Sequence, residues 1–590
     1  MGWEAWFTLA VVLAILAALI GEKVAPGAAM TAGMVVVLVA GIVDADQALA
    51  GFSSAAPITV AALYVLARAV EKTGALTPLV RATLGDRGGT RRTLARLVFP
   101  TAGISAFLNN TPIVAMLMPE VTAWAESHRR SPSTYLMPLS FAALMGGVMT
   151  VIGTSTNIVV DGLMREADAG PMGFFEIGAI GLPVALLGTV LMIAIAPKVL
   201  PARRSARQEV AEQTRQFVVD MTVDLGGALD GRPVSEAGLR HLTGVFLAAL
   251  ERGGELLAPV APETVLRGGD RLQFVGRADE VVDLQSKRGL TAVASSHLLD
   301  LDGGRARYFE AVVGADSPLV GTTLKEAGFR AAYQAAVLAV HRSGQRVDAK
   351  LGDVRLRVGD TLLLMGDPMW RERWRDRNDF LAISVHGAMA PVAGKKAITV
   401  GLITLGIVLV AALDVIPILQ ASLVGAVILV LGRVVTPGEA RNAVDLDVIV
   451  TIAASFGVAA AVHQSGLAGT IAAGLVDVFS SWGPRGVLAG VVVATVVLTG
   501  LISNNAAAAL MFPIAIETAS SAGLQPRGFF IAIAVAASTD FLTPIGYQTN
   551  TMVYGPGGYR FSDYPRLGGA LTLLVMTTTV VLVPVFWPLG

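Results

Sequence analysis

Two long apolar blocks constrain the fold of this chain more than any other feature of its sequence. They cover about residues 1–200 and 391–590. Both contain stretches of roughly 17–25 residues that are apolar enough to cross a bilayer as helices. Of the 590 residues, 54% are hydrophobic and 15% are charged, whereas a soluble domain has roughly 45–50% and 25%. The composition excludes a purely soluble protein and predicts an all-α, polytopic protein of the cell (inner) membrane, held by the lipid bilayer.

Charged residues concentrate between the two apolar blocks. The sequence has 45 Lys plus Arg and 45 Asp plus Glu, and 25 of each lie between residues 203 and 390. We therefore predict an N-terminal membrane repeat at 1–202, a polar insert at 203–390 and a C-terminal membrane repeat at 391–590. The net charge of zero gives no reason to expect a nucleic-acid partner. The lack of cysteine excludes disulfides and thiolate metal sites.

The same order of apolar segments occurs in both membrane halves: three spans, one long interrupted segment without charge, and two more spans. The segments are 3–20, 27–43, 54–70, 97–118, 135–160 and 174–198, then 397–413, 416–432, 446–462, 486–516, 528–553 and 567–588. Basic residues such as Arg91, Arg92 and Arg96 precede the first interrupted segment, which predicts that this loop and the insert are cytoplasmic. The interrupted segments then enter and leave on one side as re-entrant hairpins, giving about 10 spans plus 2 hairpins.

The polar insert contains an internal repeat. Residues 229–276 align without gaps on residues 319–366, at an offset of 90. Short alternating apolar runs separated by glycine turns predict two small α+β domains, at 203–300 and 301–390. The pattern resembles the TrkA C-terminal domain (RCK-C), which occurs as tandem pairs in several transporter families. Two roles stay open, regulation by a bound small molecule and a plain cytoplasmic spacer, because a fold alone does not define a function.

The two membrane halves repeat each other as well. The matched motifs are Asn109-Asn110-Thr111 with Ser503-Asn504-Asn505, at an offset of 394, and 150–157 with 543–550, at an offset of 393. An odd number of crossings in each half means that the second copy is inverted in the membrane. Inverted repeats with broken helices are typical of secondary transporters, whose substrates bind near the middle of the bilayer where the breaks meet.

The polar residues of these motifs suggest a binding site. Backbone that leaves a helix at membrane depth must be buried in protein or line a wet cavity. The freed carbonyl and side-chain oxygens suit a small cation such as sodium, and the N-termini of the half-helices suit an anion. Two breaks in each half predict two cation sites on either side of one anion site. The alternative is that these asparagines and threonines only join helices through hydrogen bonds.

In these motifs the sequence resembles the divalent anion:sodium symporter (DASS) family, over both membrane halves. The resemblance implies a homodimer that moves its substrate by an elevator-type displacement, with sodium ions for coupling and no organic cofactor. The implied sodium ligands are Ser105, Asn109, Asn110 and Gly153 in the first repeat, and Thr499, Ile502, Asn504 and Gly546 in the second. The implied substrate-binding residues are Asn110, Thr111, Thr154, Ser155, Asn504, Asn505, Tyr547 and Gln548.

The chain departs from the pattern of that family at several positions. Asn109 stands where a serine is expected, and Asn505 stands where a threonine is expected. Thr154-Ser155-Thr156 and Tyr547-Gln548-Thr549 replace a motif that ends in two prolines. The pocket therefore differs from that of a standard dicarboxylate carrier. The paired RCK-C-like domains resemble the branch associated with sulfate uptake, so we favour sulfate over a C4-dicarboxylate as the small anion.

Asp540 is the only carboxylate within the apolar segment 528–553. An acidic residue at membrane depth costs several kcal/mol and is a candidate functional residue. It could bind sodium, carry a coupling proton, exclude a doubly charged anion, or cap the broken helix. For this reason a cation/proton antiporter or an arsenite-type efflux carrier is an alternative function. An RCK-regulated ion channel is a further alternative. The sequence contains no recognisable set of catalytic residues, so we do not predict an enzyme.

Overall fold

The computed structural model forms two compact units. It describes residues 2–20, 24–75, 89–128, 130–202, 216–239, 245–253, 255–257, 260–277, 289–292, 307–314, 317–342, 345–347, 351–366, 369–374, 379–385, 395–413, 415–544 and 546–590. The first unit comprises Met1–Ala202, Ala390–Val553 and Arg560–Gly590, and the second comprises Arg203–Met389 and Tyr554–Tyr559. The predicted boundaries after residues 202, 300 and 390 adjoin or fall within segments outside the described residues.

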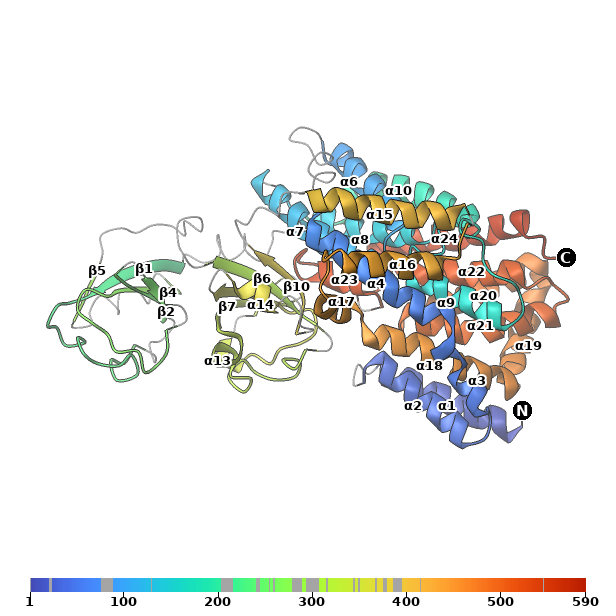
Figure 1. Ribbon diagram of the computed structural model, residues 1–590, viewed down its shortest axis with the longest axis horizontal. Helices are drawn as coiled ribbons and strands as arrows, with labels where there is room; N and C mark the ends of the chain where they lie inside the picture. Colours follow the sequence, from blue (N-terminus) through green and yellow to red (C-terminus); the bar gives the residue numbers. More distant parts are fainter. Residues whose placement is uncertain are drawn as a thin grey trace. The chain divides into compact units, whose positions relative to one another are not determined.

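The first unit is a bundle of helices (Figure 1). Its N-terminal half contains α1 (Trp3–Ile20), α2 (Pro26–Val39), α3 (Ala45–Ser53), α4 (Ala55–Thr73), α6 (Thr90–Ser105), α7 (Asn110–Ser127), α8 (Ser133–Gly147), α9 (Ser155–Glu166) and α10 (Gly178–Val199). Its C-terminal half contains α15 (Lys395–Ala412), α16 (Ile418–Leu431), α17 (Pro437–Ala443), α18 (Leu446–Gln464), α19 (Leu467–Phe479), η2 (Ser480–Trp482), α20 (Gly483–Thr499), α21 (Asn504–Ser521), α22 (Arg527–Ser538), α23 (Gln548–Tyr554) and α24 (Asp563–Phe586).

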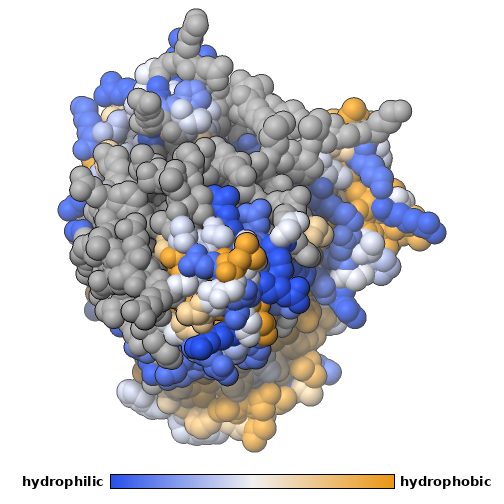
Figure 2. Space-filling view, turned by 90° about the vertical axis from the view of Figure 1, so that its left-hand side faces the viewer, coloured by the Kyte–Doolittle hydropathy of each residue, from blue (hydrophilic) through white to orange (hydrophobic). Residues whose placement is uncertain are grey.

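The length and composition of these helices agree with a polytopic membrane protein. Six helical stretches of the described chain are long and apolar enough to cross a bilayer: Trp3–Ile20, Ala45–Thr73, Gly178–Val199, Leu446–Gln464, Leu467–Thr499 and Asp563–Phe586. Large apolar side chains such as Leu402 and Leu405 on α15 and Leu187 on α10 are more than half exposed, as expected for helices that face lipid. In the face shown in Figure 2, hydrophilic and hydrophobic residues lie intermixed at the centre, and further hydrophobic residues gather at the right and lower margins. The number of spans stays a prediction.

The four polar motifs coincide with interruptions of helices. The first interrupted segment consists of α6 and α7, which are separated by residues 106–109, and its counterpart consists of α20 and α21, separated by residues 500–503. The other two motifs separate α8 from α9 and α22 from α23. Each half therefore contains one helix reversal and one broken helix, at equivalent positions in the sequence.

Three short helices, α3, α17 and α19, lie outside the predicted segments. Two of them begin at a capping box, in which the first side chain and the fourth residue satisfy each other's backbone N–H groups. In α3 the pair is Asp44 with Gln47, and in α17 it is Thr436 with Glu439. Local capping interactions define the start of α3 and α17, and a hydropathy pattern alone does not reveal such a start.

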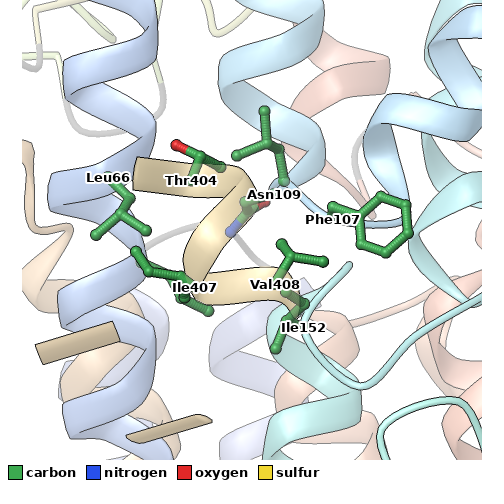
Figure 3. Close-up of a pocket in the computed structure, with 9 residues that line it drawn as sticks. Leu66, Phe107, Asn109, Ile152, Thr404, Ile407 and Val408 are labelled. Atoms are coloured by element: carbon green, nitrogen blue, oxygen red, sulfur yellow. The ribbon is translucent and has the colours of Figure 1, made fainter. Parts of the chain in front are cut away.

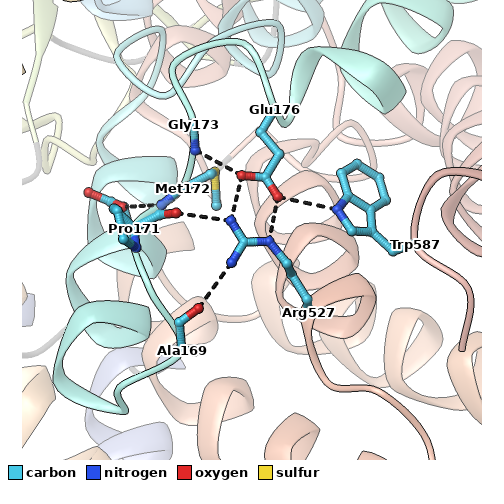
Figure 4. Close-up of polar contacts among 8 residues, drawn as sticks. Ala169, Pro171, Met172, Gly173, Glu176, Arg527 and Trp587 are labelled. Atoms are coloured by element: carbon cyan, nitrogen blue, oxygen red, sulfur yellow. Dashed lines mark hydrogen bonds and ion pairs between the residues drawn. The ribbon is translucent and has the colours of Figure 1, made fainter. Parts of the chain in front are cut away.

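An ion pair joins the two halves of the helical unit (Figure 4). Arg527, the first residue of α22, donates from Nε and Nη2 to the two carboxylate oxygens of Glu176, at 2.6 and 2.7 Å. The same guanidinium donates to the carbonyl oxygens of Ala169 (3.0 Å) and Pro171 (2.9 Å). Trp587 Nε1 also donates to Glu176, at 3.2 Å. This bidentate pair holds the loop before α10 against the start of α22 and the end of the chain.

The second unit contains two five-stranded antiparallel sheets. The strands of the first are β1 (Gln216–Val223), β2 (Val245–Arg252), β3 (Glu255–Leu257), β4 (Arg271–Arg277) and β5 (Leu290–Ala292), in the order β3-β2-β4-β1-β5. The strands of the second are β6 (Arg307–Val313), β7 (Ala335–Arg342), β8 (Gln345–Arg346), β9 (Thr361–Gly366) and β10 (Phe380–Val385), in the order β10-β6-β9-β7-β8. Read from β8 to β10, the second order repeats the first. The short elements α13 (Phe329–Tyr333), η1 (Leu351–Asp353) and α14 (Trp370–Trp374) accompany the second sheet.

The sequence repeat of the insert therefore extends to its structure. The second strand of each sheet carries an irregularity at the same place, between Leu247 and Ala249 and between Val337 and Ala339. Each sheet covers its own apolar core, which includes Phe274 in the first and Phe309 in the second.

A buried ion pair recurs in both sheets at the offset of 90 residues. Arg342 donates from Nε and Nη2 to the Asp360 carboxylate at 2.8 and 2.7 Å, and Asp360 is fully buried. Arg252 makes the same two bonds to Asp270, at 2.7 and 2.6 Å. The hydrogen bonds to Asp360 raise the pKa of the Arg342 guanidinium above its ordinary value, so this arginine stays charged at physiological pH.

We expect Arg342→Ala to destabilise the second sheet by about 3 kcal/mol, because it leaves a buried carboxylate without its cation. Pulse proteolysis of the full-length protein in urea would measure the change. The control is Arg355→Ala, since that side chain is 64% exposed and lies 3.8 Å from Glu326, a surface pair worth at most about 1 kcal/mol. Equal midpoints for the two variants would contradict the prediction.

Candidate functional site

Each helix reversal is closed by a hydrogen bond between the last residue of one helix and the first residue of the next. In the N-terminal repeat, Ser105 Oγ at the end of α6 donates to Asn110 Oδ1 at the start of α7, at 2.6 Å. In the C-terminal repeat, Thr499 Oγ1 donates to Asn504 Oδ1, at 2.8 Å. Both asparagines are almost fully buried. The two reversals thus share one geometry at positions 394 residues apart.

Each broken helix is held by one asparagine, whose amide group donates to two backbone carbonyls freed by the break. The bonds run from Asn157 Nδ2 to Gly147 O (3.1 Å) and Thr150 O (2.8 Å), and from Asn550 Nδ2 to Asp540 O (2.9 Å) and Thr543 O (3.2 Å). The helix ends are thereby satisfied inside the protein, as the bilayer requires. In the sequence these two asparagines end the repeated motifs at 150–157 and 543–550, a position that by itself does not indicate this role.

The same two asparagines connect the repeats to each other. Asn157 Oδ1 accepts a hydrogen bond from Ser538 of α22 at 3.3 Å. Asn550 Oδ1 accepts one from Ser140 of α8 at 2.8 Å. Each break is therefore completed by a serine from the broken helix of the other repeat.

Several of the predicted substrate-binding residues meet across the repeats. Asn110 Nδ2 donates to the Tyr547 hydroxyl at 3.0 Å, and Thr111 Oγ1 donates to Gln548 Oε1 at 3.2 Å. At the equivalent position, Ser155 Oγ donates to Asn505 Oδ1 at 3.1 Å. These bonds bring α7 to α23 and α9 to α21, so the starts of the half-helices face each other in pairs. The predicted residue Thr154 is buried immediately before α9 and lies next to Tyr547.

Two polar groups at the start of α21 are buried without a partner in the described part of the chain. Asn504 Nδ2 and Ser503 Oγ form no hydrogen bond with any described residue. The equivalent amide, Asn110 Nδ2, is satisfied by Tyr547, but the counterpart of Tyr547 is the shorter Thr154. A buried donor left unsatisfied costs about 1–3 kcal/mol. The Asn504 amide is therefore suited to an acceptor that arrives with a ligand.

The other predicted sodium ligands cluster in two groups, one in each repeat. A Cβ atom at Gly147 would lie 2.8 Å from Asn110 Oδ1 and 3.3 Å from Gly153 O, which places Asn110 close to Gly153. A Cβ atom at Gly546 would lie 3.1 Å from Thr499 O. The remaining predicted ligand, Ile502, is buried in the turn between α20 and α21.

Asn109 occupies a different place from Asn110. Its side chain lines a small cavity of about 10 Å³ that it shares with Thr404 of α15 (Figure 3), enough room for roughly one water molecule. The other lining residues are apolar: Leu63, Leu66, Phe107, Leu108, Ile152, Ile407 and Val408. Asn109 Oδ1 accepts a bond of 3.4 Å from the Thr111 backbone N–H. Of the two neighbouring asparagines, Asn110 is therefore the one that contacts Ser105.

Asp540 is 3% exposed and lies directly after α22, where it interacts with its own loop. Its Oδ1 accepts from the Leu542 N–H and its Oδ2 accepts from Thr543 Oγ1, both at 3.3 Å. A Cβ atom at Gly546 would overlap this carboxylate. Asp540 thus points toward the predicted sodium ligands of the second repeat.

Asp445 is a neighbour of the site that the sequence analysis missed. Its Oδ2 accepts a bond of 3.4 Å from Gln548 Nε2, while its Oδ1 caps α18 by accepting from the Val448 N–H at 3.2 Å. The capping role has a sequence signal, an aspartate just before an apolar run. The contact with Gln548 has none, because it joins residues 103 positions apart.

We expect Asn157→Ala to destabilise the protein by about 2 kcal/mol or more, since two buried carbonyls and Ser538 lose their partner. Thermal unfolding of the purified protein in detergent would measure the effect as a lowered melting temperature. Asn442→Ala is the matched control, because Asn442 is exposed on α17. A melting temperature for Asn157→Ala equal to that of the control would contradict this role.

Comparison with known proteins identifies relatives over nearly the whole chain. A profile of the citrate transporter family (CitMHS) matches residues 16–534 and 483–589. A protein of Chlamydomonas reinhardtii described as a sulfur deprivation response regulator is 36% identical over 561 residues, covering 93% of this chain and 96% of that protein. An uncharacterized transporter of Synechocystis sp. is 33% identical over 571 residues, covering 93% and 92%. Sodium/sulfate cotransporter 2 of Chlamydomonas reinhardtii is 24% identical over 741 residues, covering 91% and 84%.

Broken helices that meet across two repeats inside a bundle of apolar helices define a polytopic membrane transporter. The chain belongs to the citrate transporter family, which is related to the divalent anion:sodium symporters. It is accordingly a multi-pass membrane transporter and not an enzyme. The alternative of an ion channel finds no support among these relatives.

Proposed function

We propose that this protein is a sodium-coupled symporter of a small divalent anion, with sulfate favoured over a C4-dicarboxylate. The observation that carries the proposal is the Asn504 amide, which is buried and unpartnered at the start of α21. Helix N-termini and amide donors bind anions. The starts of α7 and α9 lie beside residues of the other repeat through Asn110 and Ser155. Together these groups form a site for a small, doubly charged acceptor.

The C-terminal ends of the helices that stop at the interruptions support sodium coupling. α6, α8, α20 and α22 end at the same interruptions, so their last carbonyls present partial negative charge there. Side-chain oxygens of Ser105 and Asn110 in one repeat, and of Thr499 and Asn504 in the other, add neutral ligands. Freed carbonyls of this kind bind sodium in transporters with broken helices.

The choice of sulfate rests on the relatives and on the pocket. A relative described as sodium/sulfate cotransporter 2, and another described by its response to sulfur deprivation, match more than 90% of this chain. The family profile, by contrast, is named for citrate. The bonds of Thr111 to Gln548 and of Ser155 to Asn505 join the starts of half-helices from the two repeats. In this proposal a site built across these bonds takes a compact anion in preference to a dicarboxylate.

The remaining parts of the proposal concern assembly and regulation. In this proposal the two sheet domains act as a regulatory pair of RCK-C domains on the cytoplasmic side. Their shared strand order supports the pairing of two like domains. The transporter works as a homodimer, in which the broken helices move as an elevator against a scaffold that includes α2 and α16. A cation/proton antiporter or an efflux carrier of the arsenite type is the second candidate, favoured by the buried acid Asp540.

Uptake into proteoliposomes tests the proposed function. Radiolabelled sulfate should accumulate only with an inward sodium gradient, and faster than succinate or citrate. Asn504→Ala should lower the rate about tenfold or more, because a hydrogen bond to a charged group contributes about 1.5–3 kcal/mol. Asn110→Ala should also lower it, because this change removes an oxygen of the first proposed sodium site and the bond to Tyr547. Asn442→Ala on α17 serves as the control. Sulfate uptake driven by a pH gradient instead of a sodium gradient would indicate proton coupling, and normal uptake by Asn504→Ala would refute the site.

A further inference from the structure

Asp540 and Gly147 occupy corresponding backbone positions in the two repeats but differ in their side chains. Asp540 and Gly147 are equivalent, because each offers its carbonyl oxygen to the asparagine that holds the break, Asn550 and Asn157 respectively. Gly147 has no side chain. A Cβ atom there would lie 2.8 Å from Asn110 Oδ1. A side chain at this position therefore points toward the asparagine of the helix reversal, and only the C-terminal repeat has one.

The surroundings of Asp540 disfavour a negative charge. α20 ends at Thr499 and α22 ends at Ser538, and the C-terminus of a helix carries partial negative charge. The carboxylate is 3% exposed, and its hydrogen bonds from the Leu542 N–H and from Thr543 Oγ1 are both 3.3 Å long. No Lys, Arg or His of the described chain forms an ion pair with it. An unpaired buried carboxylate costs several kcal/mol, so this arrangement calls for a cation.

Two oxygen atoms from different segments lie close to Gly546. A Cβ atom on Gly546 would lie 3.1 Å from Thr499 O and would overlap Asp540 Oδ2. Thr499 is the last residue of α20, so its carbonyl has no donor within the helix. Thr499 Oγ1 lies 2.8 Å from both Asn504 Oδ1 and Ala537 O, and its single proton serves one of these two acceptors. A carboxylate oxygen of Asp540 and the carbonyl oxygen of Thr499 thus meet where the glycine leaves space.

We propose that the two cation sites of this transporter are unequal, and that the site of the C-terminal repeat binds its cation through the Asp540 carboxylate, together with Thr499 O. The inference rests on the proposed sodium coupling and extends it. The N-terminal site consists of neutral oxygens around Ser105, Asn110 and Gly153. The C-terminal site carries a formal negative charge, so it binds sodium more tightly and fills at a lower sodium concentration.

Binding of ²²Na⁺ to the purified full-length protein, without any anion, tests this inference. The wild type should show a tight and a weak component. Asp540→Asn should raise the dissociation constant of the tight component about tenfold or more, whereas Asp540→Glu should keep two components. The control is Asp161→Asn, which removes another buried carboxylate of the helical unit. Asp161 is paired with Arg165 at 2.9 Å and accepts from the Met172 N–H at 2.7 Å, and its loss should leave sodium binding unchanged.

Each outcome separates this inference from the proposed function. If Asp540→Asn binds sodium as the wild type does, the inference is overturned. In that case Asp540 is neutralised by a proton or stabilised by the hydrogen bonds of its own loop. Loss of the tight component in a protein that does not take up sulfate would support the inference and overturn the choice of substrate. A wild type that binds no sodium would overturn both. Monodisperse elution of each variant from size-exclusion chromatography ensures that the proteins compared are folded.

Discussion

The structure of the helical unit depends on the satisfaction of backbone groups at the helix breaks. A helix that stops inside a bilayer leaves carbonyl and N–H groups that lipid cannot satisfy. Asn157 and Asn550 meet this requirement, because each amide nitrogen donates to two carbonyls of its own break. The oxygen of each amide accepts from a serine of the other repeat. Neither break is complete alone, so the two repeats stabilise each other's interruptions.

The two repeats share a backbone arrangement, but their side chains differ at several positions of the site. Tyr547 satisfies the Asn110 amide, whereas the equivalent Thr154 leaves the Asn504 amide without a partner. Asp540 likewise stands where the other repeat has Gly147. Two sites built from the same repeated motif can therefore differ in their charge and in the number of hydrogen-bond donors left for a ligand. Such differences allow a repeat protein to bind chemically different solutes side by side.

The insert shows how far a sequence repeat predicts a fold. The gapless match at an offset of 90 residues carries over to strand order, to the irregular second strand and to the buried arginine–aspartate pair. These features follow local sequence patterns, which a linear alignment detects directly. The short helices α3 and α17 escaped prediction for the opposite reason, since their signal is a capping box and not a hydrophobic period.

The sequence by itself determined the apolar helices, the polar insert and the positions of all four interruptions, because length, hydropathy and repeated motifs are local properties of a chain. Only the tertiary structure decided which polar residues meet. Asn109 and Asn110 are neighbours, yet one lines a cavity with Thr404 and the other bonds to Ser105 and Tyr547. Asn109 lies in the turn before α7 and Asn110 is the first residue of that helix, so packing selects which of the two faces the site. Partners such as Ser155 and Asn505 lie 350 positions apart, a separation that no local pattern encodes.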